Sequence, residues 1–152
     1  MKFTGILIAN RGEISIRIAR AAADIGIRSV AVYSSDDQES LHTKIANEAV
    51  LIPGLGALAY LDINQIIQAA QDANCDAIHP GYGFLSERVE LAASCAAVGI
   101  TFIGPTEEHL TLFGDKGAAR RAAIDAGVPV LKGTDHPVEI DELTEFFDAV
   151  EG

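Results

Sequence analysis

The sequence predicts an α/β fold, in which a doubly wound and mostly parallel β-sheet is followed by a C-terminal helical extension. The first observation is that short apolar runs alternate with longer segments whose apolar residues recur at helical spacing, a pattern typical of β-α-β units. The second is that the pattern from Thr106 onward is mainly helical. The third is size, because 152 residues, 49% of them apolar, can bury a substantial core.

The first third of the chain carries three expected strands and one long helix. Apolar residues recur at helical spacing from Ile14 to Ile25, and Gly26 ends the pattern. The three strands are short apolar runs of the kind found in buried parallel sheets: Ile6–Ala9, Ser29–Tyr33 and Ala49–Ile52.

The middle of the chain continues the alternation. Asp62 precedes a helical pattern and Gln65 follows three residues later, which together predict a capping box. A strand is expected at Asp76–His79, a helix at about Glu87–Val98, and a further strand at Thr101–Ile103.

The C-terminal part is expected to hold mostly helices. Two helices are predicted at about Thr106–Phe113 and Lys116–Ala126, and an amphipathic helix at about Glu139–Val150. Between the second and the third, Val128–Leu131 has the composition of a short strand.

Bulk composition excludes several classes of function. The net charge of −11 argues against nucleic acid as a partner, since such a surface needs a basic stripe. Cys75 and Cys95 fit neither a zinc site nor a disulfide framework and are predicted to be buried thiols. The apolar run Phe3–Ala9 is too short for a membrane span or a signal peptide. We therefore expect a soluble, cytoplasmic protein without a membrane partner.

The first turn from strand to helix, Ala9–Glu13, argues against binding of a dinucleotide. It has one glycine, Gly12, where the GxGxxG fingerprint needs three to let the backbone approach a pyrophosphate. Asn10 and Glu13 stand three residues apart before a helical pattern. Their spacing predicts a structural role as a capping box.

Ligands of doubly wound sheets bind beyond the carboxyl ends of the strands. Four segments follow expected strands and should meet at that edge: Ala9–Gly12, Tyr33–Asp37, His79–Ser86 and Gly104–Pro105. The third of them contains the most unusual composition of the chain, AIHPGYGFLSE.

In AIHPGYGFLSE, Ser86 is predicted to be the N-cap of the following helix, with Glu87 in its first turn. Tyr82 stands between two glycines, Gly81 and Gly83, which free the backbone to fold tightly and to present N–H groups. A flat aromatic side chain there could stack on a flat ligand. The alternative is a loop aromatic that is simply buried.

The step Gly114-Asp115-Lys116 suggests a second binding feature. Gly114 suits the position just past a helix and Asp115 suits an N-cap, so Lys116 falls at the first helical residue. A cation there opposes the helix dipole, whereas a bound anion would favour it. A solvated lysine at a small energetic cost is the alternative.

Four motifs, in the order ANRGEISIRIARA (9–21), HPGYGFLSE (79–87), FIGP (102–105) and GDK (114–116), resemble the N-terminal domain of biotin carboxylase. The same domain begins the carboxylase parts of acetyl-, propionyl- and other acyl-CoA carboxylases and of pyruvate carboxylase. Two positions depart from the family pattern. Asn47 stands where an aspartate is expected, and Arg88 stands where an asparagine is usual.

The resemblance implies a Rossmann-like pre-ATP-grasp domain spanning residues 1–152 of a larger ligase. Such enzymes use ATP and bicarbonate to form carboxyphosphate and then carboxylate biotin on a carrier domain. By this resemblance Lys116 contacts the phosphates of the nucleotide. The residues implied at the bicarbonate and biotin side are His79, Tyr82, Gly83, Phe84 and Glu87.

The resemblance also implies partners and missing parts. Arg17, Arg20 and Asp24 match a dimerisation face, although an exposed helix face would look the same. The other implied partners are a biotin carboxyl carrier domain and a carboxyltransferase component. The glycine-rich lid of the ATP-grasp part, the magnesium ligands and the C-terminal domains are expected after Gly152, so the chain alone is expected to be inactive. The alternatives are a non-catalytic binding or scaffold module and the N-terminal domain of another ATP-grasp ligase.

Overall fold

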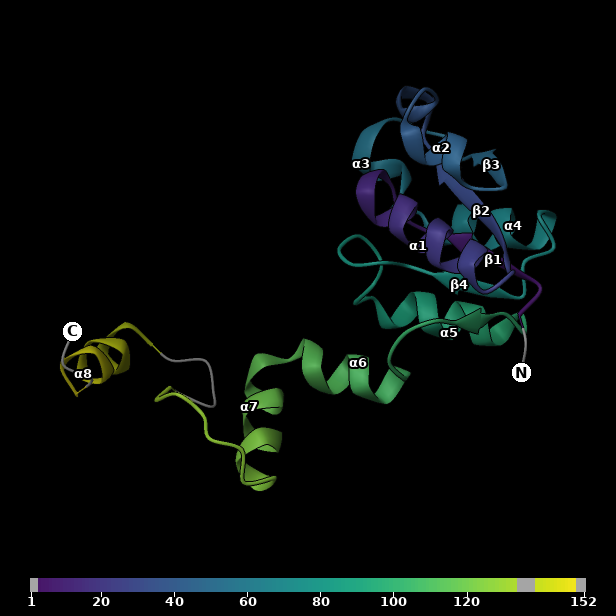
Figure 1. The fold of residues 1–152 in the computed structure, drawn as a ribbon. Helices are drawn as coiled ribbons and strands as arrows, with labels where there is room; N and C mark the ends of the chain where they lie inside the picture. The colour runs from purple at the N-terminus through teal and green to yellow at the C-terminus, as the bar shows by residue number, and fades with distance from the viewer. Residues whose placement is uncertain (1–2, 134–138, 150–152) are drawn as a thin grey trace. The chain divides into compact units, whose positions relative to one another are not determined.

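The computed structural model describes residues 3–133 and 139–149. The chain divides into two compact units, one ending at Glu107 and the other beginning at Glu108 (Figure 1). The expectation that residues 1–152 form one domain stays a prediction.

The first unit is built on one sheet of five parallel strands in the order β3-β2-β1-β4-β5. The order confirms the doubly wound fold, because the chain moves outward from β1 to β3, returns to pair β4 with β1, and then continues to β5. The strands are β1 (Gly5–Ile8), β2 (Arg28–Tyr33), β3 (Glu48–Leu51), β4 (Ala77–His79) and β5 (Thr101–Phe102). The five strands predicted for this region are confirmed and differ only at their ends.

Helices connect the strands (Figure 1). They are α1 (Gly12–Asp24), α2 (Leu41–Ile45), α3 (Gly56–Ala59), α4 (Ile63–Asp72) and α5 (Val89–Ala97), with a 3₁₀ turn η1 (Ser35–Asp37). The helical pattern of α1, α4 and α5 is confirmed. The connection holding η1, α2 and α3 was not predicted to be helical, because helices of three to five residues are too short to show a repeat.

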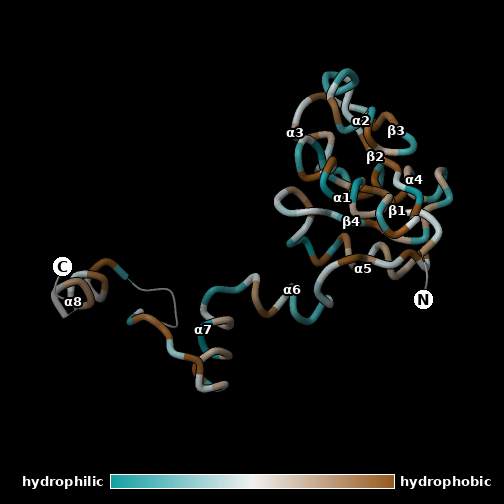
Figure 2. The backbone as a smooth tube through the Cα atoms, in the orientation of Figure 1, coloured by the Kyte–Doolittle hydropathy of each residue, from teal (hydrophilic) through white to brown (hydrophobic). Residues whose placement is uncertain are grey.

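The core lies on both faces of the sheet, since neighbouring strand residues point to opposite sides. Leu7 and Ile78 pack in the larger cluster, with residues of α4 and α5. Ile6 and Ala77 pack on the other side, with Ala22 of α1. Figure 2 shows α1 alternating between hydrophilic and hydrophobic residues, as a helix with one buried face should.

The start of α4 confirms the predicted cap. The Asp62 carboxylate accepts the backbone N–H of Gln65 at 3.1 Å. The Gln65 amide donates to the other oxygen of the same carboxylate at 2.9 Å. The Asp62 half of the capping box is therefore confirmed, whereas the Gln65 side chain bonds the Asp62 carboxylate in place of its backbone N–H.

The predicted start of α5 is wrong. Ser86 and Glu87 lie in a turn, and Arg88 is the N-cap, without a side-chain bond to the helix. The reason is an extra turn after the glycine-rich stretch: Ser86 N–H donates to the Gly83 carbonyl and Arg88 N–H to the Leu85 carbonyl. These two bonds close a turn over residues 83–88, so regular helical hydrogen bonding follows only after Arg88, whose carbonyl accepts the Leu91 N–H.

The C-terminal extension contains α6 (Glu107–Gly114), α7 (Lys116–Asp125) and α8 (Ile140–Ala149), so the predicted helices are confirmed over the described residues. Val150, the predicted end of the last helix, lies outside the described residues. The predicted strand at Val128–Leu131 is wrong: it pairs with no strand among the described residues, and Leu131 is 88% exposed. Gly114 was predicted to stand just past a helix, but it is the last residue of α6, and its φ is not positive.

Candidate functional site

The site begins where β1 and β4 end. These strands are parallel neighbours, with Ile8 opposite His79, so the connections that follow them leave the sheet at one edge. Ala9 N–H donates to the His79 carbonyl at 3.0 Å and carries the pairing one residue further. The parallel sheet thus brings together the carboxyl ends of the strands, as predicted.

Asn10 links the two connections. Its side-chain amide donates to the Pro80 carbonyl at 2.7 Å and to the Tyr82 carbonyl at 2.9 Å, while its Oδ1 accepts the Arg11 N–H at 2.8 Å. The residue is 1% exposed. The predicted capping box is therefore wrong: Arg11 is the N-cap of α1, and Glu13 accepts a hydrogen bond from the Tyr82 hydroxyl.

The backbone of the segment after β4 takes an unusual path. Gly81, Gly83 and Phe84 have φ values of 67°, 68° and 44°, which are costly for residues with a side chain. A Cβ on Gly81 would also lie 2.6 Å from Ile14 and 2.7 Å from the Asn10 amide nitrogen. A Cβ on Gly83 would meet nothing within 4 Å, so the space beside Gly83 is open.

The two aromatics of the segment face different surroundings. Tyr82 is 61% exposed, and its bond to Glu13 raises the pKa of its hydroxyl. Phe84 packs against the core, with its ring centroid 5.4 Å from that of the fully buried Tyr60. The alternative interpretation of Tyr82, a loop aromatic that is simply buried, therefore does not apply to it, because its ring is exposed to solvent. Phe84 is the aromatic of the segment that packs against the core.

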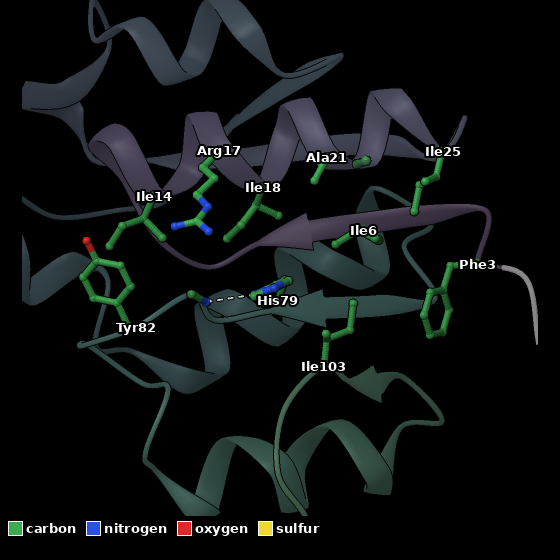
Figure 3. A pocket seen from close by; sticks show the side chains of 12 residues that line it. Phe3, Ile6, Ile14, Arg17, Ile18, Ala21, Ile25, His79, Tyr82 and Ile103 are labelled. Atoms are coloured by element: carbon green, nitrogen blue, oxygen red, sulfur yellow. Dashed lines mark hydrogen bonds between the residues drawn. The ribbon is translucent and has the colours of Figure 1, made fainter.

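His79 ends β4 and is tied to the same segment. Its Nδ1 accepts the Gly81 N–H at 3.0 Å, drawn as the dashed line in Figure 3. Burial lowers the pKa of the ring. A neutral imidazole with Nδ1 unprotonated is the form that this hydrogen bond requires.

An apolar groove of about 530 Å³ runs beside the segment. Figure 3 shows Ile14, Arg17 and Ile18 projecting from α1 on one side, with His79 and Tyr82 on the other. The polar groups in it are few, so the groove suits an apolar occupant with one charged or polar end.

A second cluster lies beyond β2. Asp37 accepts hydrogen bonds from Arg11 at 2.7 Å, from the Tyr60 hydroxyl at 2.8 Å and from Ser40 at 3.0 Å. Burial opposes its ionisation, but these bonds hold the pKa of the carboxyl below its usual value. In dinucleotide-binding folds a carboxylate near this position binds the ribose. In this chain the side chains of Arg11, Tyr60 and Ser40 already bond the Asp37 carboxylate. This agrees with the lack of a GxGxxG fingerprint in the first turn from strand to helix.

Arg11 and Asp37 belong to two of the four segments that were predicted to meet at the carboxyl edge, and they do meet. The sequence did not predict their bond or the bond of Tyr60, because Tyr60 and Arg11 lie 23 and 26 residues from Asp37 and no local spacing pattern connects them. A buried tyrosine with an acidic partner leaves no periodic signal.

The remaining predicted residues lie elsewhere. Lys116, in the second unit, is the exposed first residue of α7, and Asp115 caps that helix by accepting the Ala118 N–H at 2.7 Å. Glu87 is exposed after the turn that follows the glycine-rich stretch. The roles assigned to both residues stay predictions.

The predicted dimer face lies on α1. Its residues are exposed and line a shallow hollow together with Leu41 of α2; they are Arg17, Arg20 and Asp24. This position fits both a dimer contact and an exposed helix face, so the assignment stays a prediction.

The two departures from the family pattern have local partners. Asn47 accepts the backbone N–H of Ser29 at 2.9 Å and its hydroxyl at 3.0 Å, an acceptor role that an aspartate would also fill. Arg88 pairs with Glu90 at 3.0 Å.

Within residues 3–133 and 139–149, no group of three or more His, Cys, Asp or Glu side chains is arranged to hold a metal ion. Nor does any helix there have the length and apolarity to cross a membrane. Cys75 and Cys95 are both free and buried, as predicted.

Comparison with known proteins gives consistent results. A family model described as the N-terminal domain of biotin carboxylase matches residues 2–110. A pyruvate carboxylase from Staphylococcus aureus is 55% identical over 144 residues, which are 93% of this chain and 12% of that protein. A biotin carboxylase from a Nostoc species is 50% identical over 143 residues, which are 93% of this chain and 32% of that protein.

A solved structure is similar as well. The biotin carboxylase domain of a 2-oxoglutarate carboxylase from Hydrogenobacter thermophilus has a TM-score of 0.93 and 37% identity. The match covers 100% of this chain and 34% of that one. The chain thus spans from about an eighth to about a third of the relatives that it matches. It belongs to the family of biotin carboxylase N-terminal domains.

Proposed function

We propose that the chain is the N-terminal part of an ATP-dependent biotin carboxylase, which converts ATP, bicarbonate and carrier-bound biotin into carboxybiotin, ADP and phosphate. One observation carries the proposal: in a chain of this family, the segment HPGYGFLSE stands at the carboxyl edge of the sheet, with its backbone held from β1. We call residues 79–87 the biotin-side loop.

The geometry of the biotin-side loop suits a flat, polar ligand. The Tyr82 hydroxyl is held by Glu13, which leaves the exposed ring available for stacking. The open space at Gly83 lets a ligand approach the backbone closely. His79 and Glu87 bound the loop, and Phe84 anchors it in the core.

Lys116 is the residue that we propose for the nucleotide. Its ammonium stands at the first residue of α7, where the unpaired backbone N–H groups also favour an anion. The related 2-oxoglutarate carboxylase domain was solved with MgADP and bicarbonate. The described residues hold no cluster that fits magnesium, so we assign no magnesium ligand within them.

The partners that we propose follow from the relatives. Pyruvate carboxylases and a single-chain long-chain acyl-CoA carboxylase are among the similar proteins. We therefore propose a biotin carboxyl carrier domain and a carboxyltransferase as partners. The related 2-oxoglutarate carboxylase domain was solved as a dimer, which supports a homodimer. We propose the exposed face of α1 with Arg17, Arg20 and Asp24 as its contact.

The substitution Gly83→Val in a complete enzyme tests the function of the loop. Such an enzyme can be made by placing residues 1–152 in the Nostoc biotin carboxylase, which is 50% identical. We expect biotin-dependent ADP release to fall about tenfold or more, because valine resists the positive φ and fills the ligand side of the loop. ADP release and the thermal midpoint are measured together.

Gly99→Val is the matched control. Gly99 has a φ of 74° and also has nothing within 4 Å of an added Cβ, but it lies past the end of α5. Both variants should lose similar stability, and only Gly83→Val should lose turnover. Equal losses of turnover would make the loop a structural turn. A folded wild-type enzyme without bicarbonate- and biotin-dependent ADP release would favour a scaffold module.

A further inference from the structure

We infer that Asn10 is a positioning residue for the biotin-side loop: its buried amide holds the backbone on both sides of Gly81. The inference rests on the proposed function, because it assigns Asn10 to the reaction in which that loop takes part. The sequence spacing predicts that Asn10 caps a helix, whereas in the structure its amide bonds the backbone of the biotin-side loop.

The contacts of Asn10 use both of its donor hydrogens for the loop and its oxygen for its own turn. The two amide hydrogens go to the Pro80 and Tyr82 carbonyls at 2.7 and 2.9 Å, and Oδ1 accepts the Arg11 N–H at 2.8 Å. The side chain is 1% exposed, so water does not compete for these partners.

Few other side chains could replace it. A side chain at this position must donate two hydrogen bonds to the loop and accept one from the Arg11 N–H. It must also be short enough to reach all three partners. An aspartate has no donor when ionised, and a serine has only one. Any such change would leave at least one loop carbonyl without its partner, which is costly in a buried place.

The loop needs an external support. Gly81, Gly83 and Phe84 all have positive φ, and Phe84 pays a steric cost for it. The Asn10 amide lies 2.7 Å from the place where a Cβ of Gly81 would be, so amide and glycine fit against each other. We conclude that Asn10 and Gly81 form one packed unit at the ends of two paired strands.

Tyr82 is supported both by the connection between β1 and α1 and by the first turn of α1. Its carbonyl is held by Asn10 and its hydroxyl by Glu13. A ring fixed at both ends loses little freedom when a ligand stacks on it, and displacement by about 1 Å can cost about a hundredfold in rate. The role of Asn10 is thus to set the place of the stacking ring and of the neighbouring N–H groups.

The test is Asn10→Asp in the complete enzyme described above. This change keeps the size and the acceptor but replaces the two N–H donors with an oxygen facing two carbonyls. We expect kcat for biotin-dependent ADP release to fall about tenfold to a hundredfold, with the KM for ATP unchanged. The activity relative to wild type should rise as pH falls, because a protonated carboxyl regains one O–H donor.

Asn47→Asp is the control. It makes the same chemical change at a side chain that acts as an acceptor toward Ser29, so kcat and its pH profile should match the wild type. Hydrogen exchange of the peptide covering residues 80–84 should be faster in Asn10→Asp and unchanged in Asn47→Asp.

The outcomes separate the two proposals. A lower melting temperature of Asn10→Asp with wild-type kcat, exchange and pH profile would overturn the positioning role. If the wild-type enzyme itself released no ADP with biotin, the proposed function would fail, and the exchange experiment would still decide whether Asn10 holds the loop.

Discussion

His42 shows how one buried side chain links folding to pH. It is 1% exposed, its Nε2 lies 3.3 Å from the Val32 carbonyl, and its Nδ1 has no partner among the described residues. Burial lowers the pKa of the ring, against the opposing effects of the Val32 carbonyl and the Asp37 carboxylate, while Arg11 also lowers it. The fold therefore prefers a neutral His42.

This preference predicts a loss of stability in acid. Above the ordinary pKa of 6.5 both the folded and the unfolded chain hold a neutral ring, and the contribution of His42 is fully present. As pH falls below 6.5, the unfolded chain takes up a proton that the folded one resists, so the free energy of unfolding decreases. Chemical denaturation from about pH 7 to about pH 5 should show this decrease, and His42→Gln should make it smaller.

His109→Gln provides the comparison, because His109 is exposed on α6. His79, whose pKa is also lowered by burial, should keep part of the slope in both variants. An identical slope in wild type and His42→Gln would show that His42 does not contribute.

At the scale of a secondary-structure element, the start of α7 is the place for which we propose a bound anion. Asp115 caps it in the expected way, but the next residue is Lys116, and Arg120 and Arg121 follow one turn later. The helix has no acidic residue in its first turn. The Asp115 carboxylate favours this start, whereas the Lys116 cation opposes the helix dipole, and a bound anion would offset that opposition.

Lys116→Ala should separate binding from stability. In the complete enzyme we expect the ATP concentration needed for half-maximal rate to rise about tenfold to a hundredfold, since a charge-assisted contact contributes about 1.5–3 kcal/mol. The melting temperature should stay the same or rise slightly, because a cation that opposes the helix dipole has been removed. Initial rates over a range of ATP concentrations and a thermal melt measure both.

Lys132→Ala serves as the control, since Lys132 is exposed and lies after the end of α7. It should change neither quantity. An unchanged ATP requirement together with a clear drop in the melting temperature would make Lys116 a structural residue.

At the scale of the whole molecule, the first unit carries a complete sheet with a core on both faces. Its two cysteines are free and buried, and burial raises the pKa of both thiols to about 11, so the fold depends on no disulfide. These features indicate that the chain can fold without its relatives' remaining parts.

We therefore expect the pure 152-residue protein to fold cooperatively and to release no ADP from ATP and bicarbonate. Phosphoryl transfer depends on metal ions and on closely positioned charges, and this chain spans only from about an eighth to about a third of the relatives that it matches. Thermal melting by circular dichroism and a coupled ADP assay provide the measurement. Bicarbonate-dependent ADP release that disappears in Lys116→Ala would contradict this expectation, because it would exclude a contaminating ATPase.

Much of this molecule was predictable from the sequence. The strands of the sheet, the helices α1, α4 and α7, and the caps at Asp62 and Asp115 depend on side chains within a few residues of one another. The motifs of the glycine-rich stretch likewise indicated the family that residues 2–110 match. Helix caps and hydrophobic periodicity depend only on residues that are close together in the sequence, so they can be predicted from it.

The tertiary structure alone decided the roles of residues whose partners are far away in the chain. Asn10 and Glu13 have the spacing of a capping box, yet Asn10 binds Pro80, 70 residues on, and Glu13 binds Tyr82, 69 residues on. Val128–Leu131 has the composition of a strand but pairs with no strand among the described residues. A strand exists only with a neighbour, and a buried amide bonds to the groups that folding places beside it, so local sequence cannot determine either outcome.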